Sequence, residues 1–395
     1  MTGRERLLTT LAGRIPDCVP VAPDFSNMIP CRMTGKPFWD LYLYMDPPPW
    51  EAYIACAKHF DIDAVMDGYF PFRWPSDPVD PRPWERFIVH RDRDLLVTQT
   101  GYAENGRRVW NDRVDVYYRA DPPTAGVDPA KIGLPATPAH FEPVTGVKPV
   151  DFGMVGLRRT KQLLGDQGLL GVFITHTCFT GNEEAVYYYS DHPEELEAVR
   201  ARRLAEVERR FADLMAMTPE DRPDFLCVGG SGSLVFQTPD FFREHALPAV
   251  KRAIELAAAA GIPTHVHSCG PEKELVKIMA EETALTVIDP LEIPPMGDCD
   301  LADLKRRFGR RITLKGNLHT TEVMLRGSVA DVEAAARKAI DDAAEGGRFI
   351  LSTGDQCGRD TPDENLHALV RMARTYGHYA SSSAGADVCR GRNAL

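Results

Sequence analysis

A short His-x-Cys motif, His267-Ser268-Cys269, ends an apolar β-branched run in the second half of the chain, and Cys357 follows a later run of the same kind. In an extended segment, residues i and i+2 point the same way, so His267 and Cys269 can reach one ion. Imidazole and thiolates are ligands that Zn²⁺ favours, and three protein ligands with one open position are typical of a catalytic zinc. A buried thiol and a hydrogen-bonded core histidine are the alternative interpretation.

Other polar side chains follow the remaining apolar runs. We expect Asp24, Asn27, His176 and His319 to line a substrate pocket, although each has the alternative role of an ordinary polar residue at a strand end. Asp67 and Glu292 are the catalytic candidates. Glu292 or Asp289 is also a candidate for a displaceable fourth zinc ligand, against the alternative of an exposed carboxylate on a Pro-rich loop.

The elements that must position these residues alternate regularly. Helical patterns separate short apolar runs, which we predict to be eight strands near Val19, near Ala64 and at 169–175, 225–228, 264–267, 286–288, 312–315 and 349–352. Eight strands with crossover helices predict an α/β fold, the (β/α)₈ TIM barrel, whose active site lies at the carboxyl ends of the strands. A doubly wound sheet is the alternative, disfavoured because no Gly-rich turn follows the first strand.

Two segments depart from that alternation. The N-terminus is expected to form a helical extension, and residues 86–120 alternate in a pattern typical of antiparallel strands, with an Asn105-Gly106 turn signal that predicts a β-hairpin insertion. We expect one barrel domain over 1–380, followed by a disordered small and polar tail at 381–395.

Composition excludes several classes of function. The 395 residues carry a formal charge of −11, which argues against a nucleic-acid partner. No run of 18 apolar residues is present, so no membrane span is expected. Nine scattered cysteines in a chain of this size predict a reducing, cytoplasmic environment rather than a disulfide scaffold.

Three stretches resemble the uroporphyrinogen decarboxylase superfamily: residues 4–21, then 240–270, which end in His-x-Cys-Gly, and then 314–370, with Thr361-Pro362 and Asn365 after the last strand. The resemblance covers about residues 3–378 and implies a (β/α)₈ barrel with an N-terminal extension. True decarboxylases carry an Arg-Gln-Ala-Gly-Arg motif after the first strand, whereas this chain has Ala-Pro-Asp-Phe-Ser-Asn there. Asp67 loosely matches their active-site aspartate.

The chain is more similar to the corrinoid-dependent methyltransferases of that superfamily. In that branch, residues matching His267, Cys269 and Cys357 bind zinc; the last Cys there usually follows a glycine, whereas Asp355-Gln356 precede it here. The resemblance implies a zinc-dependent methyltransferase, active in O-demethylation or in transfer from a methylated corrinoid. Its partners would be free cobalamin or a corrinoid protein and a small methyl donor or acceptor, and a homodimer is compatible with it.

Two other functions compete with this interpretation. A metal-free, uroporphyrinogen decarboxylase-like lyase predicts no zinc and a cluster of cationic residues at the barrel mouth. A non-catalytic tetrapyrrole-binding protein predicts tight ligand binding without turnover.

Overall fold

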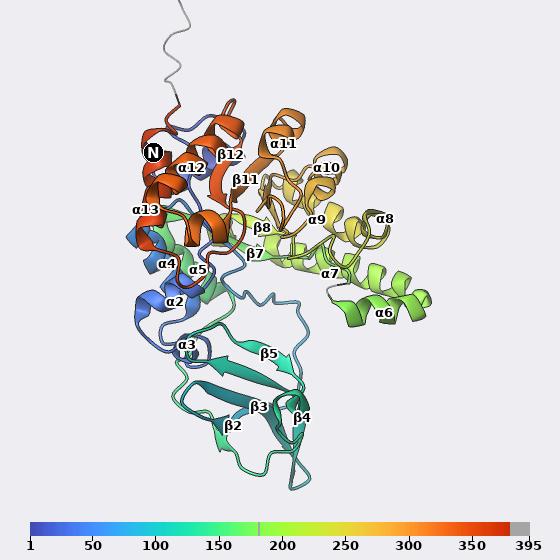
Figure 1. Cartoon of the computed structure of the whole chain (residues 1–395). Coiled ribbons are helices and arrows are strands. Elements are labelled where there is room, and N and C mark those ends of the chain that lie inside the picture. Colours follow the sequence, from blue (N-terminus) through green and yellow to red (C-terminus); the bar gives the residue numbers. More distant parts are fainter. Residues whose placement is uncertain (181, 380–395) are drawn as a thin grey trace, which may run out of the picture.

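The computed structural model describes residues 1–180 and 182–379. Its centre is a parallel sheet of seven strands whose order in space follows their order in the chain (Figure 1). The strands are β1 (Ala64–Asp67), β7 (Gly168–Phe173), β8 (Phe225–Cys227), β9 (Thr264–His267), β10 (Val287–Asp289), β11 (Thr313–Leu318) and β12 (Phe349–Thr353). The predicted tail at 381–395 lies outside the described residues.

The segment 19–22 closes this sheet into a barrel. Val21 forms a parallel bridge with Leu351 of β12, and on its other side its carbonyl accepts the Asp63 amide at 2.8 Å, directly before β1. The segment therefore stands between the first and last strands of the sheet. This confirms the predicted (β/α)₈ class, with the eighth strand reduced to a short extended segment.

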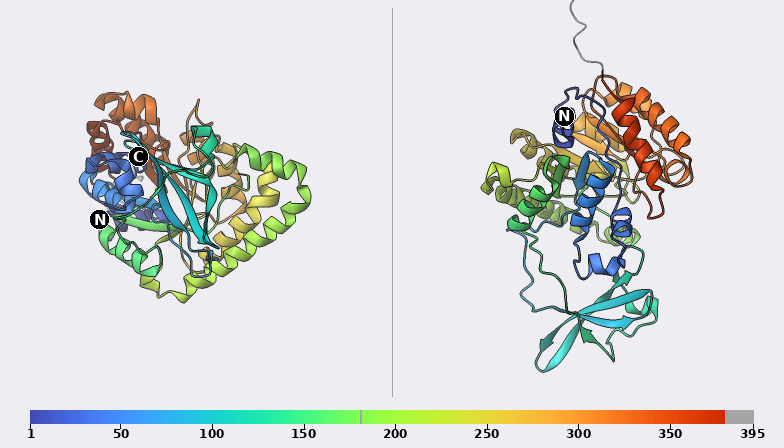
Figure 2. Two further views of the ribbon diagram at one scale, coloured as in Figure 1. Left: turned by 90° about the horizontal axis from the view of Figure 1, so that it is seen from below. Right: turned by 90° about the vertical axis from the view of Figure 1, so that its left-hand side faces the viewer.

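Helices surround the barrel (Figure 2), and the main helices bury one face against it. In α9, the buried residues Ala249, Val250, Ala253, Ile254 and Ala257 recur at helical spacing. The main helices are α1 (Gly3–Leu11), α4 (Pro49–Phe60), α5 (Met154–Leu164), α7 (Leu196–Ala216), α9 (Leu247–Ala259), α10 (Lys273–Glu282), α11 (Leu301–Phe308), α12 (Val329–Ala343) and α13 (Asp363–Thr375). Shorter ones are α2 (Met28–Thr34), α3 (Phe38–Tyr42), α6 (Glu183–Asp191) and α8 (Pro239–Phe241).

The predicted antiparallel insertion is present and is larger than a hairpin. Its five strands lie in the order β5-β4-β3-β2-β6 and form a sheet that lies below the barrel in Figure 1. Asn105 and Gly106 both have positive φ at the turn between β3 and β4, as an Asn-Gly hairpin turn requires. The strands are β2 (Glu85–Arg91), β3 (Leu95–Glu104), β4 (Arg107–Tyr118), β5 (Thr124–Val127) and β6 (Glu142–Pro143).

A small apolar cluster holds the insertion against the segment after α3. Leu43 packs there with Ile88, Leu96 and Tyr117, and the half-buried Tyr42 contacts the same cluster. The antiparallel sheet is thereby held over one end of the barrel (Figure 2). No helix among the described residues has the length and apolar character needed to cross a membrane.

Candidate active site at the barrel mouth

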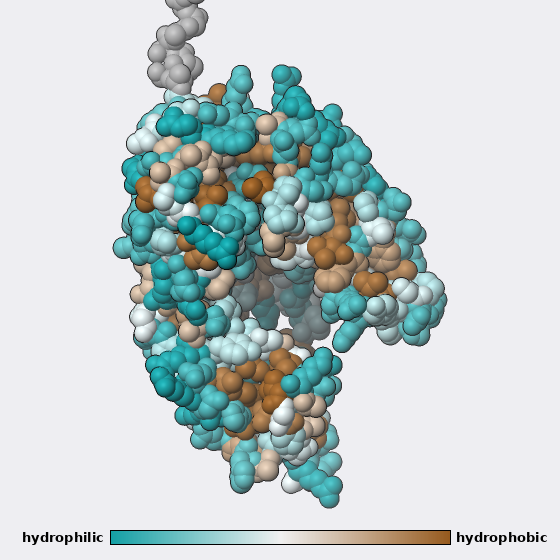
Figure 3. All heavy atoms as spheres, in the orientation of Figure 1, coloured by the Kyte–Doolittle hydropathy of each residue, from teal (hydrophilic) through white to brown (hydrophobic). Residues whose placement is uncertain are grey.

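The carboxyl ends of the strands open toward the insertion, and the surface is hollowed between the two parts (Figure 3). A cavity of about 370 Å³ lies there. Its lining combines carboxylates, aromatic rings and small residues. The lining residues are Asp24, Ser26, Asn27, Tyr42, Asp67, Gly68, Tyr69, Pro122, Phe173, Gly230, Ser231, His267 and Gln356.

His267 is the last residue of β9, and Cys269 follows two residues later. The intervening Ser268 faces elsewhere: its hydroxyl accepts the Ser233 amide at 3.1 Å, and its own amide donates to the Asp289 carbonyl. The ligand atoms of His267 and of Cys269 each lie within 4.8 Å of an oxygen of Asp355. Both side chains are therefore at the same end of the barrel, and their role as a ligand pair stays a prediction.

Carboxylates surround this pair. The ligand atoms of His267, Asp24 and Asp355 lie within 4.8 Å of one another, and so do those of Cys269, Glu292 and Asp355. Asp355 belongs to both groups, and its Oδ1 lies 3.7 Å from His267 Nε2. Burial raises the pKa of Asp355 to about 6. Sequence reasoning noticed Asp355 only as the context of Cys357.

A buried ion network lies behind the pair, inside the barrel. The Lys315 ammonium contacts Asp289 Oδ2, and His265 Nε2 lies 2.7 Å from Asp289 Oδ1. Asp289 Oδ1 is also 3.5 Å from His267 Nδ1. Burial alone would raise the pKa of Asp289, but Lys315 and the two imidazoles outweigh burial and hold that pKa well below its usual range.

Asp67 extends this network to the cavity. Its carboxylate lines the cavity and lies 3.7 Å from His265 Nδ1. Burial raises the pKa of Asp67. Asp67, His265 and Asp289 form a third group with metal-ligand spacing, but the Lys315 ammonium already supplies the positive charge there. Lys315 and His265 were not among the site residues predicted from the sequence. The feature that could have indicated them is their position as charged or titratable residues inside strand segments that are otherwise apolar or β-branched.

Asp24 and Asn27 lie on the wall of the cavity, as predicted. Asp24 Oδ1 accepts hydrogen bonds from the Tyr69 hydroxyl at 2.8 Å and from the Ser26 amide at 2.7 Å. The Oδ1 atom of Asn27 is buried and has no hydrogen-bond partner among the described residues. A buried acceptor without a partner is costly, so this atom is suited to a donor on a bound ligand.

His176 and His319 lie further out. The His176 ring stacks at a centroid distance of 4.8 Å on Phe173, which lines the cavity, and His176 itself does not line it. His319 Nδ1 accepts the amides of Thr321 and Glu322, so it caps the helical turn after β11. His319 lines a neighbouring hollow rather than the cavity that holds Asp24 and His267.

Cys357 is fully buried in the apolar core, and burial raises the pKa of its thiol to about 12. Its amide donates to the Asp24 carbonyl at 2.8 Å. None of the groups with metal-ligand spacing in the described part of the chain includes Cys357. Its role as a zinc ligand stays a prediction.

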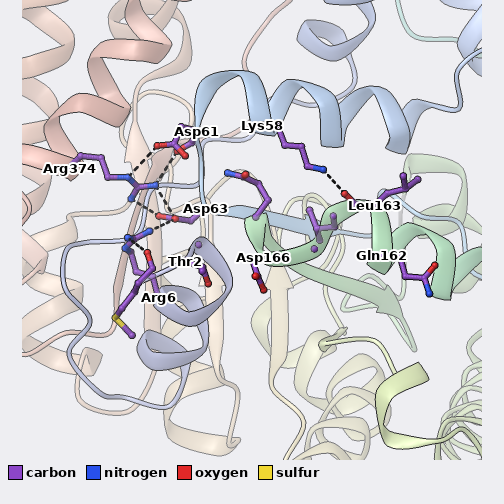
Figure 4. Close-up of a pocket in the computed structure, with 14 residues that line it drawn as sticks. Thr2, Arg6, Lys58, Asp61, Asp63, Gln162, Leu163, Asp166 and Arg374 are labelled. Carbon is purple, nitrogen blue, oxygen red and sulfur yellow. Dashed lines mark hydrogen bonds and ion pairs between the residues drawn. The ribbon is translucent and has the colours of Figure 1, made fainter.

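The opposite end of the barrel holds a second polar hollow, which Figure 4 shows. Asp63 accepts hydrogen bonds there from Arg6 and Arg374, and its Oδ2 also accepts the Val21 amide at 2.8 Å. These contacts join α1, α13, the closing segment and the residue before β1. Polar residues at the amino ends of barrel strands serve stability rather than catalysis, and the satisfied partners of Asp63 fit that role.

Comparison with known proteins finds similarity in part of the sequence and in the fold. Residues 223–376 match the model of the uroporphyrinogen decarboxylase family. The methylcobamide:CoM methyltransferase MtbA of Methanosarcina mazei is 27% identical over 139 residues, 35% of this chain and 37% of that protein. The methylcobamide:CoM methyltransferase MtaA of Methanosarcina barkeri is 28% identical over 141 residues, 35% of this chain and 38% of that protein.

These matches span little more than a third of the length of either relative. A solved methyltransferase from Methanosarcina mazei superposes over 95% of this chain and 99% of its own, with a TM-score of 0.57 and 16% identity, which extends the likeness in fold to the whole barrel. Residues 223–376 are thus similar to the uroporphyrinogen decarboxylase family, and the curated relatives that match are methylcobamide:CoM methyltransferases.

Proposed function

We propose that this chain is a zinc-dependent methyltransferase that moves a methyl group between a corrinoid and a small thiol, ether or similar substrate. The observation that carries the proposal is the placement of His267 and Cys269 at the carboxyl end of β9, beside the carboxylates of Asp355 and Glu292. The likeness to methylcobamide-dependent relatives supports the corrinoid.

The residues at this site fit a zinc ion. Zinc binds imidazole, thiolate and carboxylate, and two ligand atoms on one tetrahedral zinc are roughly 3.4 Å apart. His267 Nε2 and Asp355 Oδ1 are 3.7 Å apart, while Asp289 lies behind the imidazole at Nδ1. A carboxylate at the second nitrogen of a ligand histidine fixes its orientation. When bound, zinc would lower the pKa of a substrate thiol or polarise an ether oxygen.

The size of the cavity indicates where the small substrate and the corrinoid would each bind. A cavity of about 370 Å³ suits a small molecule and is far too small for a corrin ring. The corrinoid therefore has to lie across the opening. Two exposed apolar side chains flank the site there: Val235 beside Gly270, and Met296 in the hollow that contains Glu292. They are suited to contact the apolar face of such a ring.

We propose that Asp67 accepts the proton that the acceptor thiol loses. When an acceptor thiol takes a methyl group from a methylated corrinoid, a carbon–sulfur bond would form, the cobalt–carbon bond would break with its electron pair left on the corrinoid, and the thiol proton would have to leave. Asp67 lines the cavity, and burial raises its pKa, which brings this carboxylate closer to neutral pH as a base. His265 and Asp289 behind it extend the polar path away from the cavity.

The charge of the cavity favours an uncharged or cationic substrate. Asp24 and Asp67 are on its wall with the rings of Tyr42, Tyr69 and Phe173, and no lysine or arginine is among the described residues that line it. A buried anion without a cationic partner is unfavourable. The same charge pattern disfavours the competing metal-free lyase, which would need cations to hold substrate carboxylates.

The test combines metal analysis with transfer from methylcobalamin to three thiols of similar length: 2-aminoethanethiol, 2-mercaptoethanol and 2-mercaptoethanesulfonate. We expect about one zinc per chain, loss of zinc in Cys269→Ala, and kcat/KM lowest for the sulfonate. Asp24→Asn keeps the hydrogen-bond acceptor but removes the negative charge. It should therefore reduce the difference in kcat/KM between the cationic 2-aminoethanethiol and the anionic 2-mercaptoethanesulfonate. Purified wild type without zinc and without transfer would overturn the proposed function.

A further inference from the structure

The antiparallel insertion contains a small cavity of its own, with a volume of about 160 Å³. Its walls come from β2, β3, β4 and the segment 134–140. None of its lining residues lines the cavity at the barrel mouth, so the two hollows are separate. The residues that line the insertion cavity are Val89, Gln99, Val114, Leu134, Pro135, Pro138, Ala139 and His140.

Most of this lining is apolar. Val89, Val114 and Leu134 belong to one apolar cluster of the insertion, and Pro135 and Pro138 add two rings to the wall. An apolar cavity of about 150 Å³ stays dry and accepts a single aromatic ring such as benzene. The volume and the lining therefore suit one ring rather than a larger molecule.

Gln99 is the buried polar side chain of this wall, with 1% of its surface exposed. Its Nε2 donates to the Asn111 carbonyl at 2.6 Å and to the Ala136 carbonyl at 2.9 Å. These two acceptors fix the orientation of the amide, because exchanging its nitrogen and oxygen would place the oxygen against both carbonyls. The remaining atom, Oε1, is buried and has no hydrogen-bond partner among the described residues.

The unpartnered oxygen favours a ligand that donates a hydrogen bond. A buried acceptor without a partner is unfavourable, so a donor that reaches Gln99 Oε1 would be bound more tightly for it. Ordered water needs two to four polar partners. The side chains of the lining offer it only Gln99 and the exposed His140. An aromatic ring that carries a hydroxyl group would satisfy both the apolar walls and the oxygen.

We propose that the insertion cavity binds a small phenol, whose hydroxyl donates to Gln99 Oε1 and whose ring contacts Val114, Leu134 and Pro138. The inference concerns the insertion and does not rest on the proposed function. Such a site distinguishes a phenol from its methyl ether, because the ether oxygen has no hydrogen to donate. A tyrosine side chain of another protein offers the same group, so the experiment includes a tyrosine derivative.

The experiment measures binding to the full chain by ¹⁹F NMR, from the line width of 4-fluorophenol and its displacement by phenol, anisole or N-acetyltyrosinamide. Ala139→Trp places an indole at the exposed rim of the cavity, and Gln99→Met removes the acceptor at similar side-chain length. Ala125→Trp, at an exposed position on β5 outside the lining, is the matched control. Circular dichroism and Tm show whether each variant is folded.

We expect phenol to bind saturably in the millimolar range, as the small size of the ligand allows. It should bind at least about fivefold more tightly than anisole, since the hydrogen bond meets an acceptor that otherwise has no partner. Ala139→Trp should abolish binding and Ala125→Trp should leave it unchanged. Gln99→Met should bind phenol and anisole equally; if this variant does not fold, Ala139→Trp and the comparison of phenol with anisole still decide the question.

Four results would overturn the proposal. Equal affinity of wild type for phenol and anisole would mean that Gln99 Oε1 does not recognise the hydroxyl. Binding that Ala139→Trp leaves unchanged would place the ligand elsewhere, for example at the barrel mouth. Tighter binding of N-acetyltyrosinamide than of phenol would replace the free phenol with a tyrosine side chain of another protein. No displacement by millimolar phenol would leave ordered water as the partner of Gln99.

Discussion

Replacing Lys315 with methionine removes the ammonium from the buried ion pair with Asp289. The two side chains are 4% and 0% exposed, so water cannot substitute for the lost charge. Removing one partner of such a pair costs about 3–5 kcal/mol. His265 remains 2.7 Å from Asp289 and shares the negative charge, which places the expected loss near the lower end, about 3 kcal/mol.

A double-mutant cycle separates this charge effect from lost packing. Asp289→Asn leaves Lys315 buried without its carboxylate and should cost a similar amount. The double variant, Lys315→Met with Asp289→Asn, leaves neither charge unpaired. Its loss should be smaller than the sum of the single losses by about 2 kcal/mol, within the range seen for contacting residues.

The free energy of unfolding is measured by urea denaturation at pH 7, with the metal content of each variant determined in parallel, because Asp289 also lies against His267. Lys338→Met is the control: this lysine is 75% exposed in its pair with Asp342, so its loss should change stability by less than about 0.5 kcal/mol. If the stability losses of the two single variants sum to the loss of the double variant within about 0.5 kcal/mol, Lys315 and Asp289 are not energetically coupled and the reasoning is refuted.

Three further predictions concern the frame around the site. Asp63→Asn should lower the free energy of unfolding by about 3–5 kcal/mol in urea denaturation while leaving zinc content unchanged, because Asp63 is a fully buried partner of Arg6 at the far end of the barrel (Figure 4). Partial burial works against ionisation of Asp17, but Arg6 holds the pKa of Asp17 well below its usual range. A carboxyl whose pKa is lower in the folded protein than in the unfolded chain, where it is about 3.9, stabilises the fold at pH values above 3.9. The Tm of wild type should therefore exceed that of Asp17→Asn by less at pH 3 than at pH 6. Gly229→Ala should weaken zinc binding about tenfold, because a Cβ there would lie 2.5 Å from the backbone nitrogen of His267.

The outcomes that would contradict these expectations are specific. Asp63→Asn as stable as wild type would mean that the hydrogen bonds around it contribute little net stability. A Tm difference for Asp17→Asn that is as large at pH 3 as at pH 6 would exclude its carboxylate as the cause. Gly230→Ala is the control for Gly229→Ala, since a Cβ at position 230 meets no atom closer than 3.3 Å; equal zinc affinity of the two variants would refute the steric argument.

The order and kind of the elements are readable from the sequence because they depend on local periodicity. The segment 264–267, Thr-His-Val-His, becomes β9, and His267 and Cys269 stand at its carboxyl end, as the pattern predicted. The Asn105-Gly106 turn is a local signal as well, since both residues adopt the positive φ that the turn requires. Helices and strands formed where the pattern of side chains already indicated them.

Contacts between distant segments had no such local signal. The extended segment 19–22 completes the barrel through hydrogen bonds to residues far along the chain, among them Leu351 and Asp63. Lys315 reads as a polar interruption of a strand until the barrel places it against Asp289, from a neighbouring strand. Such pairings depend on how eight strands close around one axis, which the spacing along the chain does not encode.

The donor that accompanies the His-x-Cys pair shows the same division. Residue types and strand ends indicated a metal site at the barrel mouth, and residue type favoured Cys357 as its third ligand. The direction of a side chain after a strand, however, depends on one or two backbone dihedral angles. Asp355 has a φ of +108° and its carboxylate lies near both His267 and Cys269, whereas Cys357 is buried and its amide donates to the Asp24 carbonyl. The sequence by itself therefore determined the barrel class and the strand ends at which the candidate side chains stand, whereas the tertiary structure alone decided which side chains meet there, because their positions depend on backbone angles and long-range closure.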